Sequence, residues 1–134
     1  MRKFLTTGYS TSAFNIAMLV LRVGAGVMAM SHGYDKLVHF AEMKSRFTNF
    51  MGLGSTLSLI LVIFSEFFCS IFLIIGLFSR LVVIPLIISM SAALFVAHNS
   101  EVFGQGEKSA LFLTCFIALL LCGPGKVSVD GMMR

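Results

Sequence analysis

Two ionisable residues lie near the middle of long apolar runs, and this feature constrains the fold more than any other. Arg22 lies in the first of these runs and Glu66 in the second. The apolar runs cover residues 13–30, 57–78, 81–97 and 110–122. In a bilayer such runs form helices, because the backbone must satisfy its own hydrogen bonds there. A charge inside such a helix is costly, so it indicates a function or a partner.

The composition places these runs in a membrane rather than in water. Of the 134 residues, 57% are hydrophobic and 12% are charged, and the mean hydropathy is +0.96. Soluble chains carry about 25% charged residues, so this chain has too few polar side chains to cover four apolar segments. The sequence therefore predicts an all-α membrane protein, a four-transmembrane-helix bundle formed by a single domain over residues 1–134.

The predicted spans follow the apolar runs and their flanking signals. They cover residues 13–34, 55–78, 80–98 and 107–122, with a short amphipathic interfacial helix at about 37–50. In that connecting segment apolar and charged residues alternate, which is typical of a helix lying on the membrane surface. A connector packed over the end of the bundle is an equally open interpretation. Spans two and three form an antiparallel hairpin, because only a few residues separate them.

The net charge of +4 does not indicate nucleic-acid binding, because the basic residues form no stripe that could follow phosphates. Arg2 and Lys3 precede the first span and favour cytoplasmic placement of both termini. The loop around Lys44 would then lie outside. Arg22 interrupts the first apolar run, so we expect this helix to be retained rather than cleaved as a secretory signal.

One face of the first span combines a charge with small residues. Arg22, Gly26, Ala29 and Gly33 recur at helical spacing, and small residues let a neighbouring backbone approach closely. Arg22 and Glu66 each lie nine residues after the start of their apolar runs. The sequence therefore predicts that they share one depth and form a direct ion pair. A packing clamp with no further function is an open alternative.

Further polar residues gather at the helix ends expected to face outward. With the central pair they form the candidate ligand-binding set, which is Arg22, His32, Tyr34, Lys36, Glu66, His98 and Glu107. If the Ser91–His98 and Glu107–Thr114 faces turn inward, these residues line a pocket open to the outer side. His98 by itself is also compatible with an interface role. No rigid ligand spacing such as H-x-x-x-H occurs, so no metal site is predicted.

The three cysteines carry no recognised redox signature. Cys69, Cys115 and Cys122 lie in apolar segments and form no C-x-x-C pair. Buried free cysteines behave as small hydrophobic residues, and we interpret these three in that way.

Several short motifs in a fixed order resemble the DoxX family of small bacterial membrane proteins. They are Leu21-Arg22-Val-Gly-Ala-Gly, Ser31-His32-Gly33-Tyr34-Asp35-Lys36-Leu37, Glu66, Ile75-Gly76-Leu77-Phe78-Ser79-Arg80, Ala97-His98-Asn99, Gly106-Glu107-Lys108-Ser109-Ala110-Leu111 and Gly123-Pro124-Gly125-Lys126-Val127-Ser128-Val129-Asp130. The resemblance implies a four-helix protein of the bacterial inner membrane. The polar positions that recur in the family correspond to Arg22, His32, Gly33, Lys36, Glu66, His98 and Glu107.

The same resemblance implies a role in redox metabolism. The family is named for a subunit of a thiosulfate:quinone oxidoreductase, and relatives are associated with oxidative stress and thiol metabolism. We therefore expect a subunit of a membrane-associated oxidoreductase system, with a partner redox protein. Quinone is the candidate cofactor, since its carbonyls could accept hydrogen bonds from His32, His98 or Arg22 in an apolar slot. Whether the chain is itself catalytic stays open, as does homo-oligomer formation.

Two functions from other classes also fit the sequence. One is a binder or carrier of a small solute or lipid without redox chemistry, and the other is a structural or assembly subunit. A quinone retained on extraction would distinguish the redox function from both.

Overall fold

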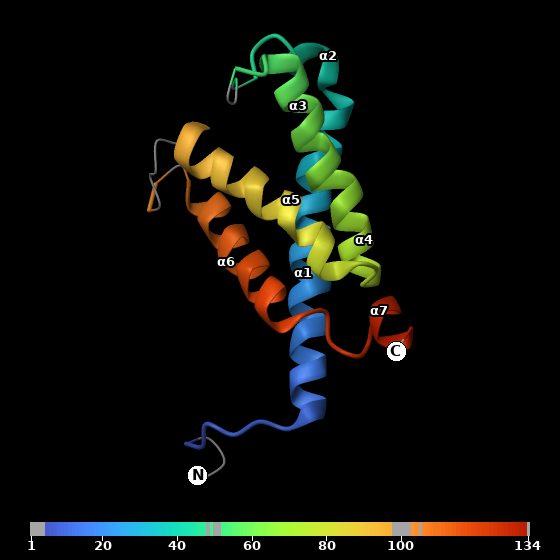
Figure 1. Ribbon diagram of the computed structural model, residues 1–134. Coiled ribbons are helices and arrows are strands. Elements are labelled where there is room, and N and C mark those ends of the chain that lie inside the picture. The colour runs from blue at the N-terminus through green and yellow to red at the C-terminus, as the bar shows by residue number, and fades with distance from the viewer. Residues whose placement is uncertain (1–4, 48, 50–51, 98–102, 105, 134) are drawn as a thin grey trace.

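The computed structural model describes residues 5–47, 49, 52–97, 103–104 and 106–133, and all regular structure in them is helical (Figure 1). The predicted all-α class is thus confirmed. The elements are α1 (Thr11–Val38), α2 (Phe40–Met43), α3 (Ser55–Ile63), the π-helix η2 (Phe64–Cys69), α4 (Ser70–Ile75), α5 (Ser79–Ala92), the π-helix η3 (Ala93–Ala97), α6 (Glu107–Cys122) and α7 (Val129–Met132). Elements α3, η2 and α4 follow one another directly, as do α5 and η3.

Within the residues that the structure describes, three helical stretches are long and apolar enough to cross a membrane. They are Thr11–Val38, Ser55–Ile75 and Ser79–Val96. Helix α6 has 16 residues, which is about 24 Å at 1.5 Å per residue, against a hydrocarbon core of about 30 Å. A fourth span at α6 therefore stays a prediction. Within the segment 37–50, the helix described after α1 is the four-residue α2, and its place at a membrane surface is also still a prediction.

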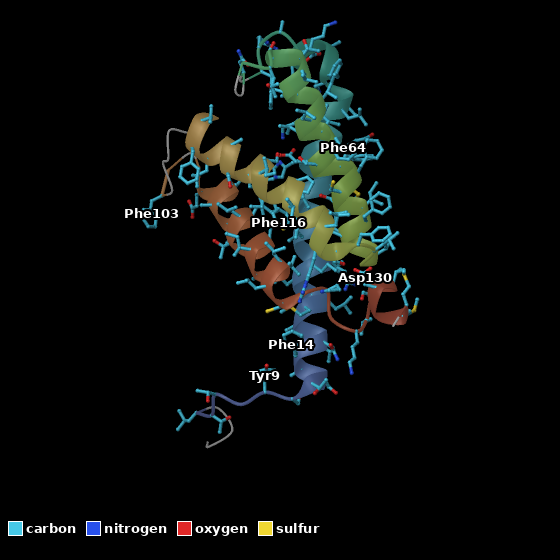
Figure 2. All side chains as sticks on the ribbon, viewed as in Figure 1. Tyr9, Phe14, Phe64, Phe103, Phe116 and Asp130 are labelled. Atoms are coloured by element: carbon cyan, nitrogen blue, oxygen red, sulfur yellow. The ribbon has the colours of Figure 1, made fainter. Side chains whose placement is uncertain are left out.

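Helix α1 is the longest element and extends beyond the rest of the bundle (Figure 1). It begins where the Ser10 hydroxyl accepts a hydrogen bond from the Ala13 N–H at 3.1 Å, which caps the first turn. Figure 2 shows Tyr9 and Phe14 at this projecting end. The buried positions of α1 are Arg22, Ala25, Gly26, Ala29 and Gly33. The predicted small-residue face is therefore the face that packs against the other helices.

The turn between α4 and α5 forms the predicted antiparallel hairpin. The Gly76 N–H bonds to the Leu73 carbonyl at 3.0 Å and the Leu77 N–H bonds to the Phe72 carbonyl at 2.9 Å. This pair of bonds is a Schellman motif, whose left-handed residue here is Gly76 at φ 77°. A Cβ at Gly76 would lie 2.3 Å from the Cβ of Ser128. Glycine at position 76 therefore permits both the left-handed turn and the close approach of the C-terminal segment.

Helices α5 and α6 run side by side (Figure 1), and α6 contacts α1 while α5 contacts η2 and α4. The buried core combines residues from all of these helices: Ala25, Ala29, Cys69, Leu73, Val82, Val83, Leu86, Met90, Phe112, Phe116 and Leu119. After α6 the chain crosses beneath the helices, and α7 lies beside the α4–α5 turn (Figure 1). The chain thus returns to the same end of the bundle at which α1 begins.

Candidate functional site

Arg22 is buried at the end of the bundle where the C-terminal segment folds back. Its guanidinium donates to the carbonyl oxygens of Pro124 at 2.6 Å, Val127 at 2.8 Å and Ile74 at 3.4 Å. The side chain is 2% exposed. Carbonyls that have no helical N–H partner need donors when buried, and the guanidinium carries five N–H donors. Arg22 therefore joins α1 to the end of α4 and to the C-terminal segment.

The predicted ion pair between Arg22 and Glu66 is wrong. Arg22 lies level with Ile74, whereas Glu66 lies level with Gly33, eleven residues further along α1. At 1.5 Å per residue, eleven residues correspond to about 16 Å. The prediction assumed that equal distances from the starts of two apolar runs mean equal depths. Helix α1 instead projects beyond its neighbours, which displaces the two charges along the bundle.

Glu66 pairs with Lys36, and a close helix contact brings the two together. The Lys36 Nζ donates to Glu66 Oε2 at 2.7 Å, and the two side chains are 20% and 7% exposed. One turn earlier on α1, a Cβ at Gly33 would lie 2.7 Å from the carbonyl carbon of Glu66 and from the amide nitrogen of Phe67. The backbones of α1 and η2 thus touch at Gly33. A π-helical turn inside a helix is frequently found at functional sites.

We group His32 with the Lys36–Glu66 pair and call these three residues the outer polar cluster, where outer means only that it lies away from the end of the bundle at which the C-terminal segment folds back. His32 and Lys36 are four residues apart on α1 and therefore share a face. The half-buried His32 ring packs edge-on against Phe112 of α6, with the ring centroids 5.8 Å apart. Phe112 in turn stacks on Phe116 at 5.9 Å. Aromatic rings of α6 thus contact α1 at His32, next to Gly33, where α1 touches η2.

The remaining candidate residues are placed differently. Tyr34 is 57% exposed and lies near the ring of Phe67, with centroids 6.3 Å apart. Glu107 is exposed at the start of α6, and Thr114 on the same face is exposed as well. The buried face of α6 carries Ser109, Phe112, Phe116 and Leu119. The hypothesis that Glu107 and Thr114 face inward is therefore wrong. His98 lies outside the described residues.

One sequence signal could have found the partner of Glu66. The buried face of α1 repeats at steps of four and three residues through Arg22, Gly26, Ala29 and Gly33. One further step of three reaches Lys36, so this lysine lies on the face that contacts the second span.

The sequence indicated no role for Asp130. Its carboxylate accepts hydrogen bonds from the Phe78 and Ser79 N–H groups, each at 2.8 Å, and so caps the start of α5.

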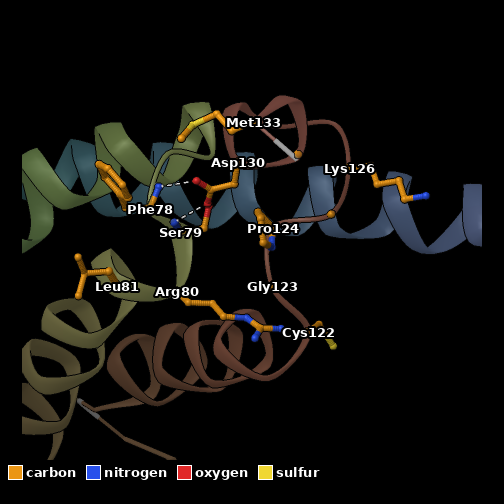
Figure 3. A pocket seen from close by; sticks show the side chains of 12 residues that line it. Phe78, Ser79, Arg80, Leu81, Cys122, Gly123, Pro124, Lys126, Asp130 and Met133 are labelled. Carbon is orange, nitrogen blue, oxygen red and sulfur yellow. Dashed lines mark hydrogen bonds between the residues drawn. The ribbon is translucent and has the colours of Figure 1, made fainter.

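A pocket of about 730 Å³ lies between the α4–α5 turn and the C-terminal segment (Figure 3). It is lined by Phe78, Ser79, Arg80, Leu81, Cys122, Gly123, Pro124, Gly125, Lys126, Asp130, Gly131 and Met133. The sequence placed the pocket at the outer ends of the helices, whereas this cavity is formed by the α4–α5 turn and the C-terminal segment.

Other reactive groups are less well placed for chemistry. Within the part of the chain that the structure describes, no group of three or more His, Cys, Asp and Glu side chains could hold a metal ion. The cysteines are free, with Cys69 buried, Cys115 half-buried and Cys122 exposed. His39 lies just after α1, and its pKa is raised above the ordinary 6.5. The larger cause is the hydrogen bond between its ring and the Asp35 carbonyl, and the smaller cause is the charge of the Asp35 carboxylate.

These features define a class: a small all-helical membrane protein whose long helices carry a buried ion pair and a buried arginine. The chain belongs to the DoxX family, whose model matches residues 17–99, more than half of the chain. The resemblance inferred from the sequence motifs is thus confirmed. The comparisons with curated proteins and with solved structures gave no match.

Proposed function

We propose that this DoxX-family protein is the quinone-binding membrane subunit of an oxidoreductase system, and that the outer polar cluster holds the quinone head group. The observation that carries the proposal is the Lys36–Glu66 pair, which joins α1 to the π-helical turn at 2.7 Å. An ionisable pair buried among apolar helices is expensive to keep and indicates a ligand or proton path. The family membership favours redox metabolism as its context.

The chemistry of the cluster fits a quinone. A quinone presents carbonyl oxygens on a flat apolar ring, so its site needs hydrogen-bond donors beside aromatic side chains. Lys36 carries a donating ammonium, and the His32 ring can donate or accept according to its tautomer. Phe112, which packs against His32, supplies an aromatic surface.

Reduction of a bound quinone needs electrons and protons from separate sources. The Glu66 carboxyl and the His32 imidazole are groups that can carry protons to the quinone oxygens. The electrons would come from a partner redox protein, because the sequence contains no C-x-x-C pair or cofactor motif. The protein would therefore act as a subunit rather than as a complete enzyme.

The placement in the membrane is part of the same proposal. With α6 as a fourth span, both chain ends lie on one side of a bacterial inner membrane, and the basic residues before α1 favour the cytoplasm. The outer polar cluster then lies toward the opposite side.

Binding of decylubiquinone to the purified protein in lipid nanodiscs tests the proposal. We expect Lys36→Gln and Glu66→Gln each to weaken binding about tenfold, since a hydrogen bond to a charged group contributes about 1.5–3 kcal/mol. The control is Glu42→Gln, which makes the same change at an exposed position on α2. Wild-type protein that binds no quinone, or variants that bind as well as wild type, would contradict the proposal and favour a carrier or an assembly role.

A further inference from the structure

The pocket between the α4–α5 turn and the C-terminal segment has no part in the proposed quinone site. We propose that it binds a phosphate group at the membrane surface, with Arg80 as the main contact. This inference rests on the position of the pocket at the ends of apolar helices and on its charge. It does not depend on the proposed function.

The pocket carries a net positive charge. Arg80 and Lys126 are its basic residues and Asp130 is its acidic residue. Both oxygens of the Asp130 carboxylate already accept backbone N–H groups at 2.8 Å, and Arg22 also attracts this carboxylate. The negative charge of Asp130 is therefore largely compensated from within the fold, so Arg80 and Lys126 leave the pocket with a net positive charge.

The guanidinium of Arg80 is available to a ligand. Figure 3 shows its side chain extending toward Gly123 and Cys122, while Lys126 points away from them. Gly123 has φ 81°, and a Cβ there would lie 3.2 Å from Arg80 Nη2, so glycine leaves room for the guanidinium. The hydrogen bond that Arg80 makes to the Leu121 carbonyl is long, at 3.5 Å. Among the described residues no carboxylate forms an ion pair with Arg80 or Lys126. A planar guanidinium can bind phosphate through two parallel bonds.

The surroundings of Arg80 fit the boundary between headgroups and acyl chains. Phe78 is 54% exposed, Leu81 is 66% exposed and Met133 is 64% exposed, and all three line the pocket. These side chains lie at the end of the bundle where α4 and α6 end and α5 begins. Basic pockets between helices at this depth bind phosphate-bearing headgroups. A phosphate could come from an anionic phospholipid or from solution, and the exposed apolar rim favours the lipid.

Native mass spectrometry of the purified protein with phosphatidylglycerol, with phosphatidylcholine and with inorganic phosphate tests the inference. We expect phosphatidylglycerol to bind better than phosphatidylcholine, and Arg80→Gln to weaken that binding about fivefold to tenfold. Arg80→Lys should keep part of the affinity. Arg46→Gln is the matched control, because Arg46 is an exposed arginine near the other end of α1.

Each outcome decides the question. Arg80-dependent binding of phosphatidylglycerol supports a lipid site, and Arg80-dependent binding of inorganic phosphate supports a site for a soluble phosphate. Equal binding by wild type and Arg80→Gln overturns the inference, as does wild-type protein that binds neither phosphate source. If Arg80→Gln does not insert into the membrane, the same comparison is made with Lys126→Gln, for which we expect a smaller loss, and unchanged binding there would contradict the inference.

Discussion

At the scale of single residues, the protein stabilises its two buried charges in different ways. Arg22 donates to the Ile74 carbonyl at the end of α4 and to the Pro124 and Val127 carbonyls between α6 and α7. Glu66 instead accepts from the ammonium of Lys36. The first arrangement fixes the C-terminal segment and leaves the guanidinium 2% exposed. The Lys36–Glu66 pair leaves Lys36 partly exposed, so of the two buried charges only this pair is accessible to a ligand.

Replacing Arg22 should destabilise the protein strongly. In Arg22→Met the carbonyls of Pro124 and Val127 lose charged donors, and we expect the free energy of unfolding to fall by about 3 kcal/mol. Arg22→Lys should lose less, because an ammonium still donates but cannot bridge several carbonyls at once. Unfolding by titration with sodium dodecyl sulfate measures both.

The control for Arg22 is Arg46→Met, which removes an exposed arginine that bonds to the Glu42 carbonyl at 3.3 Å. Its free energy of unfolding should stay close to that of wild type. An equal loss in the two methionine variants would show that the carbonyl bonds of Arg22 contribute little.

His39 should titrate above its ordinary pKa of 6.5. The folded state favours the imidazolium, so this favourable interaction is complete below pH 6.5 and is lost as the pH rises through the folded-state pKa. Asp35→Asn should lower that pKa only in part, because the larger cause is the bond to the Asp35 backbone carbonyl. Nuclear magnetic resonance of the histidine rings measures the titration, with His39→Gln identifying the signal. An unchanged midpoint in Asp35→Asn would contradict a role for the carboxylate.

At the scale of helices, close backbone contact positions the outer polar cluster. Gly33 lets α1 touch η2, and Lys36 then lies one turn further along, beside Glu66. Gly26 makes a second close contact, where a Cβ would lie 2.7 Å from the Ile74 side chain. At Gly33 the obstructing atoms are backbone, which cannot rotate away, so this glycine sets the distance between the helices.

Gly33→Ala should therefore separate α1 from η2 and weaken the Lys36–Glu66 pair. We expect a loss of about 1–3 kcal/mol in the free energy of unfolding, as for other overpacked interiors. The matched control is Gly24→Ala on the same helix, where an added Cβ has no atom within 4 Å. Gly24→Ala should be neutral or slightly stabilising, because alanine favours helix. Equal losses in the two variants would show that the contact at Gly33 is loose.

Sequence patterns predicted the helices better than their relative positions. The apolar runs located the helices, and the small-residue repeat identified the buried face of α1. Helix ends were less certain: α1 reaches Val38, although the predicted span ends at residue 34. The shift of α1 against α4 could not be predicted from the lengths of the apolar runs, because it is set by contacts between residues distant in the sequence, at Gly26 and Gly33. The candidate residues therefore included both Lys36 and Glu66, but the partner assigned to Glu66 was wrong.

At the scale of the whole molecule, the C-terminal segment folds back against the first part of α1. The Lys126 N–H donates to the Asn15 side-chain oxygen at 3.1 Å, which links the C-terminal segment to the first part of α1. The outer polar cluster and the Arg80 pocket therefore lie toward opposite ends of the helices. If the helices cross the membrane as proposed, the two sites face opposite sides.

Labelling with a membrane-impermeant maleimide should reveal this topology. In Cys69→Ser/Cys115→Ser protein, the exposed Cys122 at the end of α6 should react only after the cells are permeabilised. In a cysteine-free background, Ser45→Cys at the opposite end should react in intact cells from which the outer membrane has been removed. Labelling of Cys122 from outside would show that α6 is not a fourth span or that the orientation is reversed.

The separation of the two charges is the central claim, and a pair of double-mutant cycles on the free energy of unfolding tests it most directly. Alanine replacements of Lys36 and Glu66 should be coupled by about 1 kcal/mol or more, because the two side chains touch. Replacements of Arg22 and Glu66 should be additive within about 0.5 kcal/mol, because the two sites are distant and share no partner. Strong coupling between Arg22 and Glu66, with none between Lys36 and Glu66, would contradict the account.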